Sequence, residues 1–250
     1  EIRYYGLIYI IGLAIGYFII KKLISEKNIK LTNDEVLDYI VYLGIGLLVG
    51  GRLLYFVFYM PWTFWQDPLH IVMIWMGGMS FHGGILGAVI EGIIFCRKKN
   101  ISFYKMADIT VIPAALALAL GRVGNFINGE LPGRVWDGTF CINYENNPNI
   151  SNPPEGCRYP SQIIESIKNL IIFSSLWLVR KKNLPDGFLF WIFVTMYGVL
   201  RFLVEFIRQP DSQLGFFFGV LTMGQILSGL MIIVGAIMLY KRNHDKAERI

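Results

Sequence analysis

Seven long runs of apolar residues constrain this chain more than any other feature of its sequence. A membrane-spanning helix needs about 20 consecutive, mainly apolar residues. The candidate runs are Tyr4–Leu23, Leu37–Tyr59, Met79–Phe95, Ala107–Asn128, Ile163–Val179, Phe188–Arg208 and Phe218–Tyr240. Only 16% of the residues are charged, against about 25% in soluble domains. The sequence therefore predicts an all-α polytopic membrane protein with seven transmembrane helices.

The lysines and arginines predict how these helices are oriented. Fifteen of the 23 Lys and Arg residues lie in segments 21–30, 97–105, 180–186 and 241–250, which all fall on one side of the predicted membrane. The opposite connection, 61–78, has none. Because cytoplasmic connections are enriched in Lys and Arg, we expect the N-terminus outside and the C-terminus in the cytoplasm. The net charge of +5 then reflects topology, and we expect no nucleic-acid partner.

We expect residues 1–250 to form a single integral membrane domain with a long extracytoplasmic loop, about 129–160, between helices four and five. The loop is rich in Asn, Pro and Gly, which favour turns. Its Cys141 and Cys157 can pair in an oxidising compartment, although two free thiols are the alternative. We predict the disulfide, which peptide mapping without reductant would detect. The other outer loop, 61–78, contains three tryptophans and is expected at the headgroup level.

Polar residues within the apolar runs are costly in a bilayer, so each is a functional hypothesis. Counting along the helices places several of them at one depth near the outer surface. They are Tyr5, Arg52, His82, Arg122, Arg201 and Glu205, and we call this set the polar layer. Arg208 lies at its edge and is expected to be a headgroup-level anchor.

The stretch "LALALGRVGNFINGELPGR" (116–134) concentrates polar residues at the end of an apolar run. Arg122 and Asn125 are three residues apart and share a helix face, and Asn128 and Glu130 continue into the loop. Glycines, including Gly133, leave room for a partner to approach the backbone. The pattern is typical of an anion site in which arginine forks hold the charge.

Two other motifs have both a structural and a chemical interpretation. In "MSFHGGILG", His82 is either a base or a partner in an interhelical hydrogen bond, and Gly83 and Gly87 favour close helix packing. In "RFLVEF", Arg201 and Glu205 are four residues apart, as in a structural ion pair. The sequence has no zincin, Walker A or G-x-S-x-G motif. We therefore expect no metal and no cofactor, and a reaction in which arginines stabilise a leaving phosphate.

The block "GRVGNFINGELPGR" resembles the signature of the prolipoprotein diacylglyceryl transferase family. The blocks "YYGLIY", "GGRLLYFVFY", "GGMSFHGGILG", "YPSQIIE", "YGVLRFLVEFIRQPD" and "MGQILS" resemble its other motifs, in the same order. The resemblance covers nearly the whole chain and is weakest over 135–157. It implies transfer of the diacylglyceryl group from phosphatidylglycerol to the lipobox cysteine thiol of exported prolipoproteins. The products would be a thioether and glycerol phosphate, formed at the outer leaflet of a bacterial plasma membrane.

The resemblance also implies roles for particular residues. It makes Arg122 the ligand of the phosphatidylglycerol phosphate and Arg201 a second essential arginine, and it makes His82 a base or a phosphate ligand. Further matches to functional positions are Tyr5, Asn125, Asn128, Glu130, Gly133 and Glu205. One departure is Tyr159, where many members carry histidine, which argues against a catalytic part for that loop position.

Two rival functions use the same polar layer. A lipid phosphatase or phosphotransferase would release diacylglycerol without a peptide acceptor. An anionic-lipid transporter would have internal pseudo-symmetry and broken helices at mid-membrane. We find no internal repeat, and the polar layer is displaced toward one face, so the transferase is the preferred hypothesis.

Overall fold

Each of the seven apolar runs overlaps one α-helix. The computed structural model describes residues 4–145, 147, 150, 153–209, 216–217 and 221–247. The α-helices among them are α1 (Tyr4–Glu26), α2 (Asn33–Tyr59), α3 (Pro61–Gln66), α4 (Phe81–Lys99), α5 (Phe103–Ile127), α6 (Ser161–Val179), α7 (Phe188–Val204) and α8 (Met223–Ala247). Two short 3-10 helices, η1 (Pro68–Ile71) and η2 (Ile74–Met76), follow α3, and β1 (Phe216–Phe217) pairs antiparallel with β2 (Leu221–Thr222).

The helices have the composition of a polytopic membrane protein. Four of them, α2, α5, α6 and α8, include segments long and apolar enough to cross a membrane, and α7 is a shorter apolar helix. Many large apolar side chains on these helices are exposed, such as Leu47, Leu178 and Ile233. Such a surface suits contact with lipid rather than water. The count of seven spans and their orientation stay predictions.

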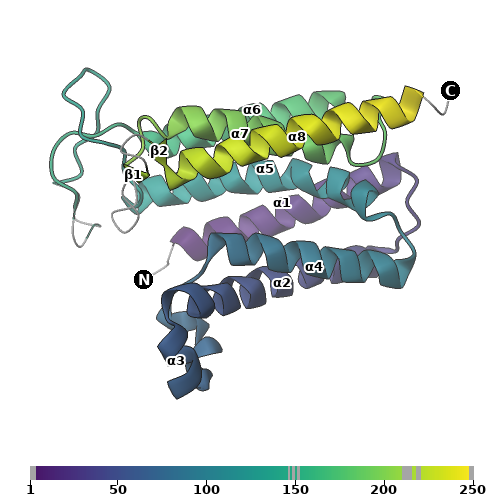
Figure 1. Ribbon diagram of the computed structural model, residues 1–250, viewed down its shortest axis with the longest axis horizontal. Coiled ribbons are helices and arrows are strands. Elements are labelled where there is room, and N and C mark those ends of the chain that lie inside the picture. The colour runs from purple at the N-terminus through teal and green to yellow at the C-terminus, as the bar shows by residue number, and fades with distance from the viewer. Residues whose placement is uncertain are drawn as a thin grey trace. The chain divides into compact units, whose positions relative to one another are not determined.

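The chain forms two compact units, which we describe separately. Unit 1 comprises residues 1–19 and 107–250, and unit 2 comprises residues 20–106. In unit 1, α7 packs against both α6 and α8, and these helices run alongside α5 (Figure 1). The α5 carboxylate of Asp108 accepts hydrogen bonds from the backbone N–H groups of Gly187 and Phe190, each 2.8 Å long. A side chain of α5 therefore caps the N-terminus of α7, where backbone donors lack partners.

In unit 2, α2 and α4 are in close contact through glycines. A Cβ atom on Gly50 would lie against the carbonyl oxygen of Gly83, and one on Gly87 would lie against that of Gly46. The absence of side chains at these positions lets the two backbones meet, as the sequence spacing of Gly83 and Gly87 predicts. Ser80 accepts a hydrogen bond of 3.2 Å from the Gly83 N–H and so caps the start of α4.

Replacing Gly87 by Ala is expected to destabilise unit 2 by about 1–3 kcal/mol, the usual cost of overpacking. The matched control is Gly44→Ala on α2, because a Cβ there would have no neighbour within 4 Å. Thermal unfolding in detergent should show a clear loss for Gly87→Ala and little change for Gly44→Ala. Equal melting temperatures for the two variants would contradict close packing at Gly87.

The structure gives Arg52 a different role from the one expected for a member of the polar layer. Arg52 is 3% exposed, and its guanidinium donates to backbone carbonyls in the segment that follows α3. The five acceptors are the carbonyl oxygens of His70, Ile71, Met73, Gly77 and Gly78. A guanidinium has five N–H groups, so all of them are used. Arg52 therefore stabilises the conformation of the 61–78 segment. None of its N–H groups remains available to bind an anion.

The segment that Arg52 holds presents its tryptophans outward. Trp62, Trp65 and Trp75 are 77%, 79% and 75% exposed. Indole rings favour the interface between lipid and water, so this exposure is compatible with the expected place of the segment at the headgroup level.

Candidate functional site

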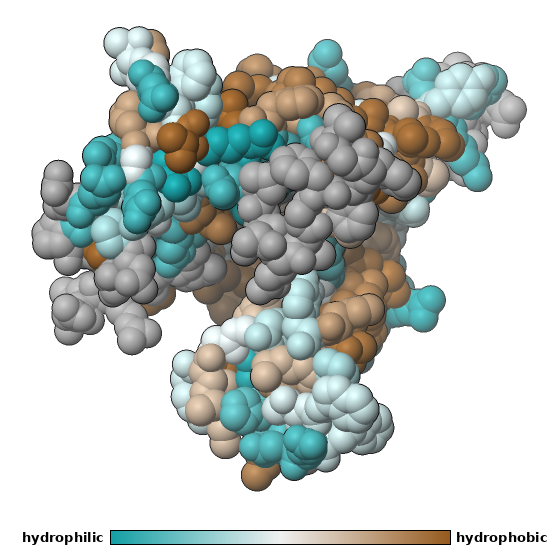
Figure 2. All heavy atoms as spheres, turned by 60° about the vertical axis from the view of Figure 1, so that its left-hand side comes forward, coloured by the Kyte–Doolittle hydropathy of each residue, from teal (hydrophilic) through white to brown (hydrophobic). Residues whose placement is uncertain are grey.

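The predicted site residues of unit 1 that the structure describes gather at one end of its helices. That end is formed by the last turns of α5 and α7 and the first turns of α6 and α8. It also carries the loop between α5 and α6 and the β1–β2 pair (Figure 1). Figure 2 is turned toward this side, and it shows hydrophilic residues among the loops and apolar residues on the flanks of the helices.

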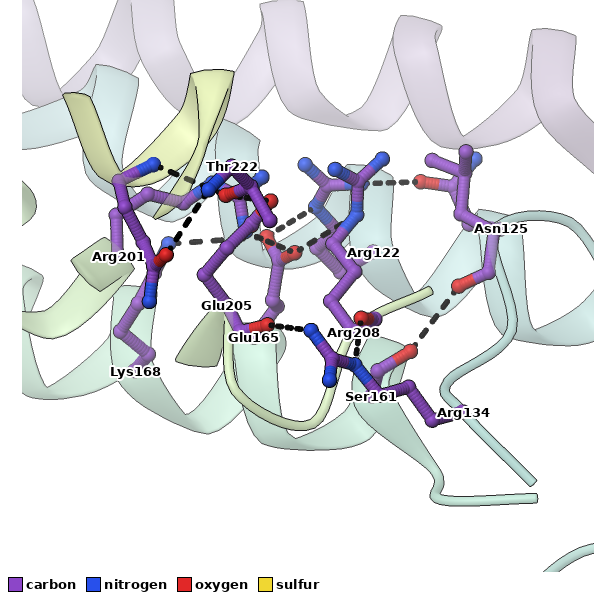
Figure 3. A network of polar contacts seen from close by, with 12 residues as sticks. Arg122, Asn125, Arg134, Ser161, Glu165, Lys168, Arg201, Glu205, Arg208 and Thr222 are labelled. Carbon is purple, nitrogen blue, oxygen red and sulfur yellow. Dashed lines mark hydrogen bonds and ion pairs between the residues drawn. The ribbon is translucent and has the colours of Figure 1, made fainter. Parts of the chain in front are cut away.

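The carboxylate of Glu165, on α6, is the centre of this polar region (Figure 3). Its side chain is 2% exposed, and four cationic side chains surround it. The nitrogen–oxygen distances are 2.9 Å for Arg122 Nε, 3.5 Å for an Arg201 terminal nitrogen, 3.7 Å for Lys168 Nζ and 3.9 Å for Arg208 Nε. We call these five residues the Glu165 cluster.

Arg122 connects the Glu165 cluster to the asparagines of the opening stretch. One terminal nitrogen of its guanidinium donates to Asn125 Oδ1 at 3.3 Å, and Asn125 Nδ2 donates to Glu130 Oε2 at 2.8 Å. Asn128 Nδ2 donates to the other oxygen of Glu130 at 3.4 Å. The two asparagines are therefore oriented by a single carboxylate at the end of α5.

Arg201 connects the cluster, through Glu205, to Thr222 of β2, directly before α8. It forms an ion pair of 2.6 Å with Glu205, whose other carboxylate oxygen accepts a hydrogen bond of 2.9 Å from Thr222 Oγ1. Glu205 is 3% exposed. A Cβ on Gly224 would lie 2.7 Å from the Glu205 carboxylate, so glycine is needed there for α8 to begin beside it.

Hydrogen bonds to backbone carbonyls hold the loop between α5 and α6 against the segment that follows α7. Arg134 donates to the carbonyl oxygens of Arg208 at 2.9 Å and Glu205 at 3.4 Å. Gly133 forms an isolated β-bridge with Arg208. A Cβ on Gly133 would lie 2.7 Å from the Tyr159 Cβ and 2.9 Å from the Ile207 carbonyl oxygen. This crowding explains why glycine occupies that position.

The loop between α5 and α6 is closed by a disulfide between Cys141 and Cys157, the pair expected from the sequence. Gln162, which is 1% exposed, donates to the Glu130 carbonyl oxygen at 2.7 Å and accepts from the Tyr144 hydroxyl at 3.2 Å. Burial raises the pKa of Tyr144, so its phenol stays a neutral donor at physiological pH. The loop is thus fixed to the first turn of α6, beside the Glu165 cluster.

Tyr159 has a structural role in this loop. Its ring stacks on Trp136 with centroids 4.7 Å apart, and its backbone N–H donates to the Arg134 carbonyl oxygen at 3.1 Å. Tyr159 therefore supports the loop next to Gly133 and Arg134. That this position has no catalytic part stays a prediction.

The structure brings together many of the residues predicted from sequence. Arg122, Arg201 and Glu205 lie in or beside the Glu165 cluster, and Asn125 and Glu130 extend it. His82 is an exposed residue in the first turn of α4, in unit 2, whereas the Glu165 cluster belongs to unit 1. Tyr5 lies in α1, and its side chain is outside the described part of the chain.

Three members of the cluster were missed or misplaced by the sequence interpretation. Glu165 and Lys168 were assigned no role, and Arg208 was expected to be a headgroup anchor. In the structure Arg208 is turned inward, with its side chain 12% exposed and its Nε 3.9 Å from Glu165. That expectation was wrong because Arg208 lies beyond the end of α7 at Val204, where helical spacing no longer predicts the direction of a side chain.

The Glu165 cluster suits the binding of an anion. It contains four cations and one carboxylate, and Glu205 adds a second carboxylate. The excess of positive charge in a buried place favours a ligand with negative charge. Within the described ranges, no group of three His, Cys, Asp or Glu side chains is suitable for a metal ion.

Comparisons with known proteins identify close relatives. A sequence model of the prolipoprotein diacylglyceryl transferase family matches residues 1–241. The chain is 43% identical to phosphatidylglycerol–prolipoprotein diacylglyceryl transferase of Geobacter sulfurreducens over 239 residues, which are 95% of this chain and 90% of the relative. It is 42% identical to the protein of that name in Aeromonas hydrophila, over 97% of this chain and 88% of the relative. The corresponding values for Rickettsia rickettsii are 39%, 97% and 93%.

Proposed function

The chain belongs to the prolipoprotein diacylglyceryl transferase family, and from this we propose that it transfers the diacylglyceryl group of phosphatidylglycerol to the lipobox cysteine of exported prolipoproteins. One observation in unit 1 carries the proposal. Arg122, Arg201 and Arg208 converge on the buried Glu165 carboxylate at the end of the bundle. Guanidinium groups are the usual partners of phosphate in proteins, and the donor lipid offers a phosphate.

The residues around the phosphate have separate tasks in this proposal. Arg122 and Arg201 bind the phosphate oxygens, and Asn125 orients Arg122 through the 3.3 Å hydrogen bond between them. Glu130 fixes Asn125 and Asn128. Glu205 holds Arg201 through their ion pair. Gly133 allows the loop backbone to lie close to Tyr159 and Ile207. Tyr5 retains the functional role implied by the family resemblance.

The reaction is a displacement at carbon. The thiolate of the acceptor cysteine attacks the glyceryl carbon, the carbon–sulfur bond forms, and the carbon–oxygen bond to phosphate breaks with its electron pair on oxygen. A free thiol has a pKa of about 8.5, so a base or a positive field must raise the thiolate fraction. His82 is the base suggested by the family resemblance. The arginines stabilise charge on the departing glycerol phosphate.

The site opens toward the outer leaflet of a bacterial plasma membrane in this proposal. Its support is the apolar surface of the helices and the distribution of Lys and Arg along the sequence. Both acyl chains can then stay in the bilayer while the headgroup reaches the Glu165 cluster at the end of the helices. The loop closed by Cys141 and Cys157 lies on the side from which an exported peptide would approach.

Purified protein, phosphatidylglycerol and a synthetic lipobox peptide test this function directly. Mass spectrometry should find a diacylglyceryl mass on the cysteine and one glycerol phosphate released per modified peptide. A peptide with serine in place of the lipobox cysteine is the matched control and should stay unmodified. Release of diacylglycerol with or without peptide, and no peptide adduct, would instead indicate a lipid phosphatase.

A further inference from the structure

Lys168 is a buried cation with no role in the reaction proposed above. Its side chain is 3% exposed, and its Nζ has no hydrogen-bond partner among the described residues. It lies 3.7 Å from Glu165 Oε2 and 4.2 Å from the centre of the Tyr197 ring. A buried ammonium that lacks hydrogen bonds is costly to the fold. Three arginines already surround Glu165, so neutralising that carboxylate does not by itself explain Lys168.

Counting the formal charges indicates what Lys168 adds. The Glu165 cluster has four positive side chains, and the negative ones are Glu165 itself and Glu205, which pairs with Arg201. Four cations against two carboxylates leave two positive charges in excess. Without the Lys168 charge the excess would be one.

The reaction also raises the negative charge of the phosphate from one to nearly two. In phosphatidylglycerol the phosphate is a diester with one negative charge. When the carbon–oxygen bond breaks, the phosphate keeps the electron pair and becomes a monoester, which carries nearly two negative charges at pH 7 because its second pKa is about 6. The sulfur loses its negative charge in the same step, so the total charge is conserved. One negative charge thus moves from the sulfur to the phosphate.

We propose that Lys168 is a positioning residue that provides the second positive charge for the departing phosphate by acting through Glu165. This inference rests on the transferase function proposed above. Lys168 Nζ and Arg122 Nε both face Glu165 Oε2, at 3.7 Å and 2.9 Å. When Arg122 turns its donors toward the phosphate, Lys168 remains as the counter-charge of the buried carboxylate. The arginines can then donate their hydrogen bonds to the leaving phosphate as its negative charge increases.

The variant Lys168→Met tests this role, because methionine keeps a long unbranched side chain and removes the charge. We expect kcat to fall about 10–100-fold, the range seen when groups that orient a site are removed, while KM for phosphatidylglycerol changes less than about threefold. Product inhibition by added glycerol phosphate should weaken by about tenfold or more. Lys168→Arg should recover most of the lost kcat, since it restores the charge.

Protein stability separates this role from a purely structural one. Removing an unbonded buried charge is neutral or stabilising when the remaining partners stay compensated, so the melting temperature of Lys168→Met should equal or exceed that of the wild type. The control is Ser166→Ala on the same helix, whose hydroxyl donates to the Ala119 carbonyl oxygen at 3.0 Å. That variant should lose some stability and keep the wild-type KM and product inhibition.

Three results would overturn the role of Lys168. The first is a Lys168→Met variant with wild-type kcat. The second is a melting temperature that falls together with kcat while product inhibition is unchanged. The third is a rise in KM with kcat unaltered. That result would mean that the Lys168 charge stabilises the bound donor lipid rather than the leaving phosphate. A wild-type protein that modifies no peptide would contradict the transferase function itself, so the two failures are distinguishable.

Discussion

Replacing Arg122 by Lys is expected to lower kcat/KM for peptide modification by about 100- to 1,000-fold, the effect of removing one donor to a developing negative charge. The guanidinium spans two partners, with Nε 2.9 Å from Glu165 and a terminal nitrogen 3.3 Å from Asn125. A lysine ammonium is a single point of charge and cannot reproduce this fork. The measurement is the initial rate of diacylglyceryl–peptide formation at several phosphatidylglycerol concentrations.

A matched control for this variant is Arg180→Lys, at the opposite end of α6. Its guanidinium lies over the Trp177 ring and donates to the Trp177 carbonyl oxygen, far along the helix from Glu165. Arg180→Lys should keep turnover within about twofold of the wild type, because distant surface changes have small effects. Near-normal turnover of Arg122→Lys would exclude the phosphate-binding role of Arg122.

Replacing Glu165 by Gln is expected to destabilise unit 1 by about 3–5 kcal/mol, as when one partner of a buried ion pair is removed. The amide has almost the same shape as the carboxylate but leaves four cations within 4 Å without their shared counter-charge. We expect a low yield of folded protein and a lower melting temperature in detergent. Thermal unfolding followed by intrinsic fluorescence measures the change.

Glu155→Gln in the loop is the control for the same chemical change at an exposed position. Its stability should stay within about 0.5 kcal/mol of the wild type. If Glu165→Gln unfolds at the wild-type temperature, the Glu165 carboxylate does not compensate the surrounding arginines and the description of the cluster is wrong.

The helices could be predicted from the sequence because apolar runs of sufficient length have few alternatives in a membrane. Each run overlaps a helix, although several helix ends differ from the predicted ones. At the start of α2, for example, Thr32 and Glu35 form a reciprocal pair of hydrogen bonds between side chain and backbone. Counting apolar residues does not detect such caps, so it predicted that helix to begin at Leu37.

The depth of a residue in a helix could also be predicted, but its partners could not. Arg52 was placed at the depth of Arg122 and Arg201, yet its donors are used by the backbone of the 61–78 segment. Helix depth follows from position along the chain. The direction of a side chain depends on which helix faces pack together, and a single sequence does not give that information.

A signal for the missed residues is nevertheless present in α6. Its buried polar residues are Ser161, Gln162, Glu165, Ser166, Lys168 and Asn169. Most of these positions recur at intervals of three or four residues, so they form one polar stripe on an otherwise apolar helix. In a membrane protein a polar stripe faces the protein interior, which would have indicated that Glu165 and Lys168 line the site.

The most direct test is a cryo-electron microscopy map of the protein in nanodiscs that contain phosphatidylglycerol. We expect density for the lipid phosphate within about 3 Å of guanidinium nitrogens of both Arg122 and Arg201, at ordinary hydrogen-bond distance. The tails should extend along the apolar flanks of the helices. A phosphate bound away from both arginines, with Arg122 still paired to Glu165, would contradict the proposed site.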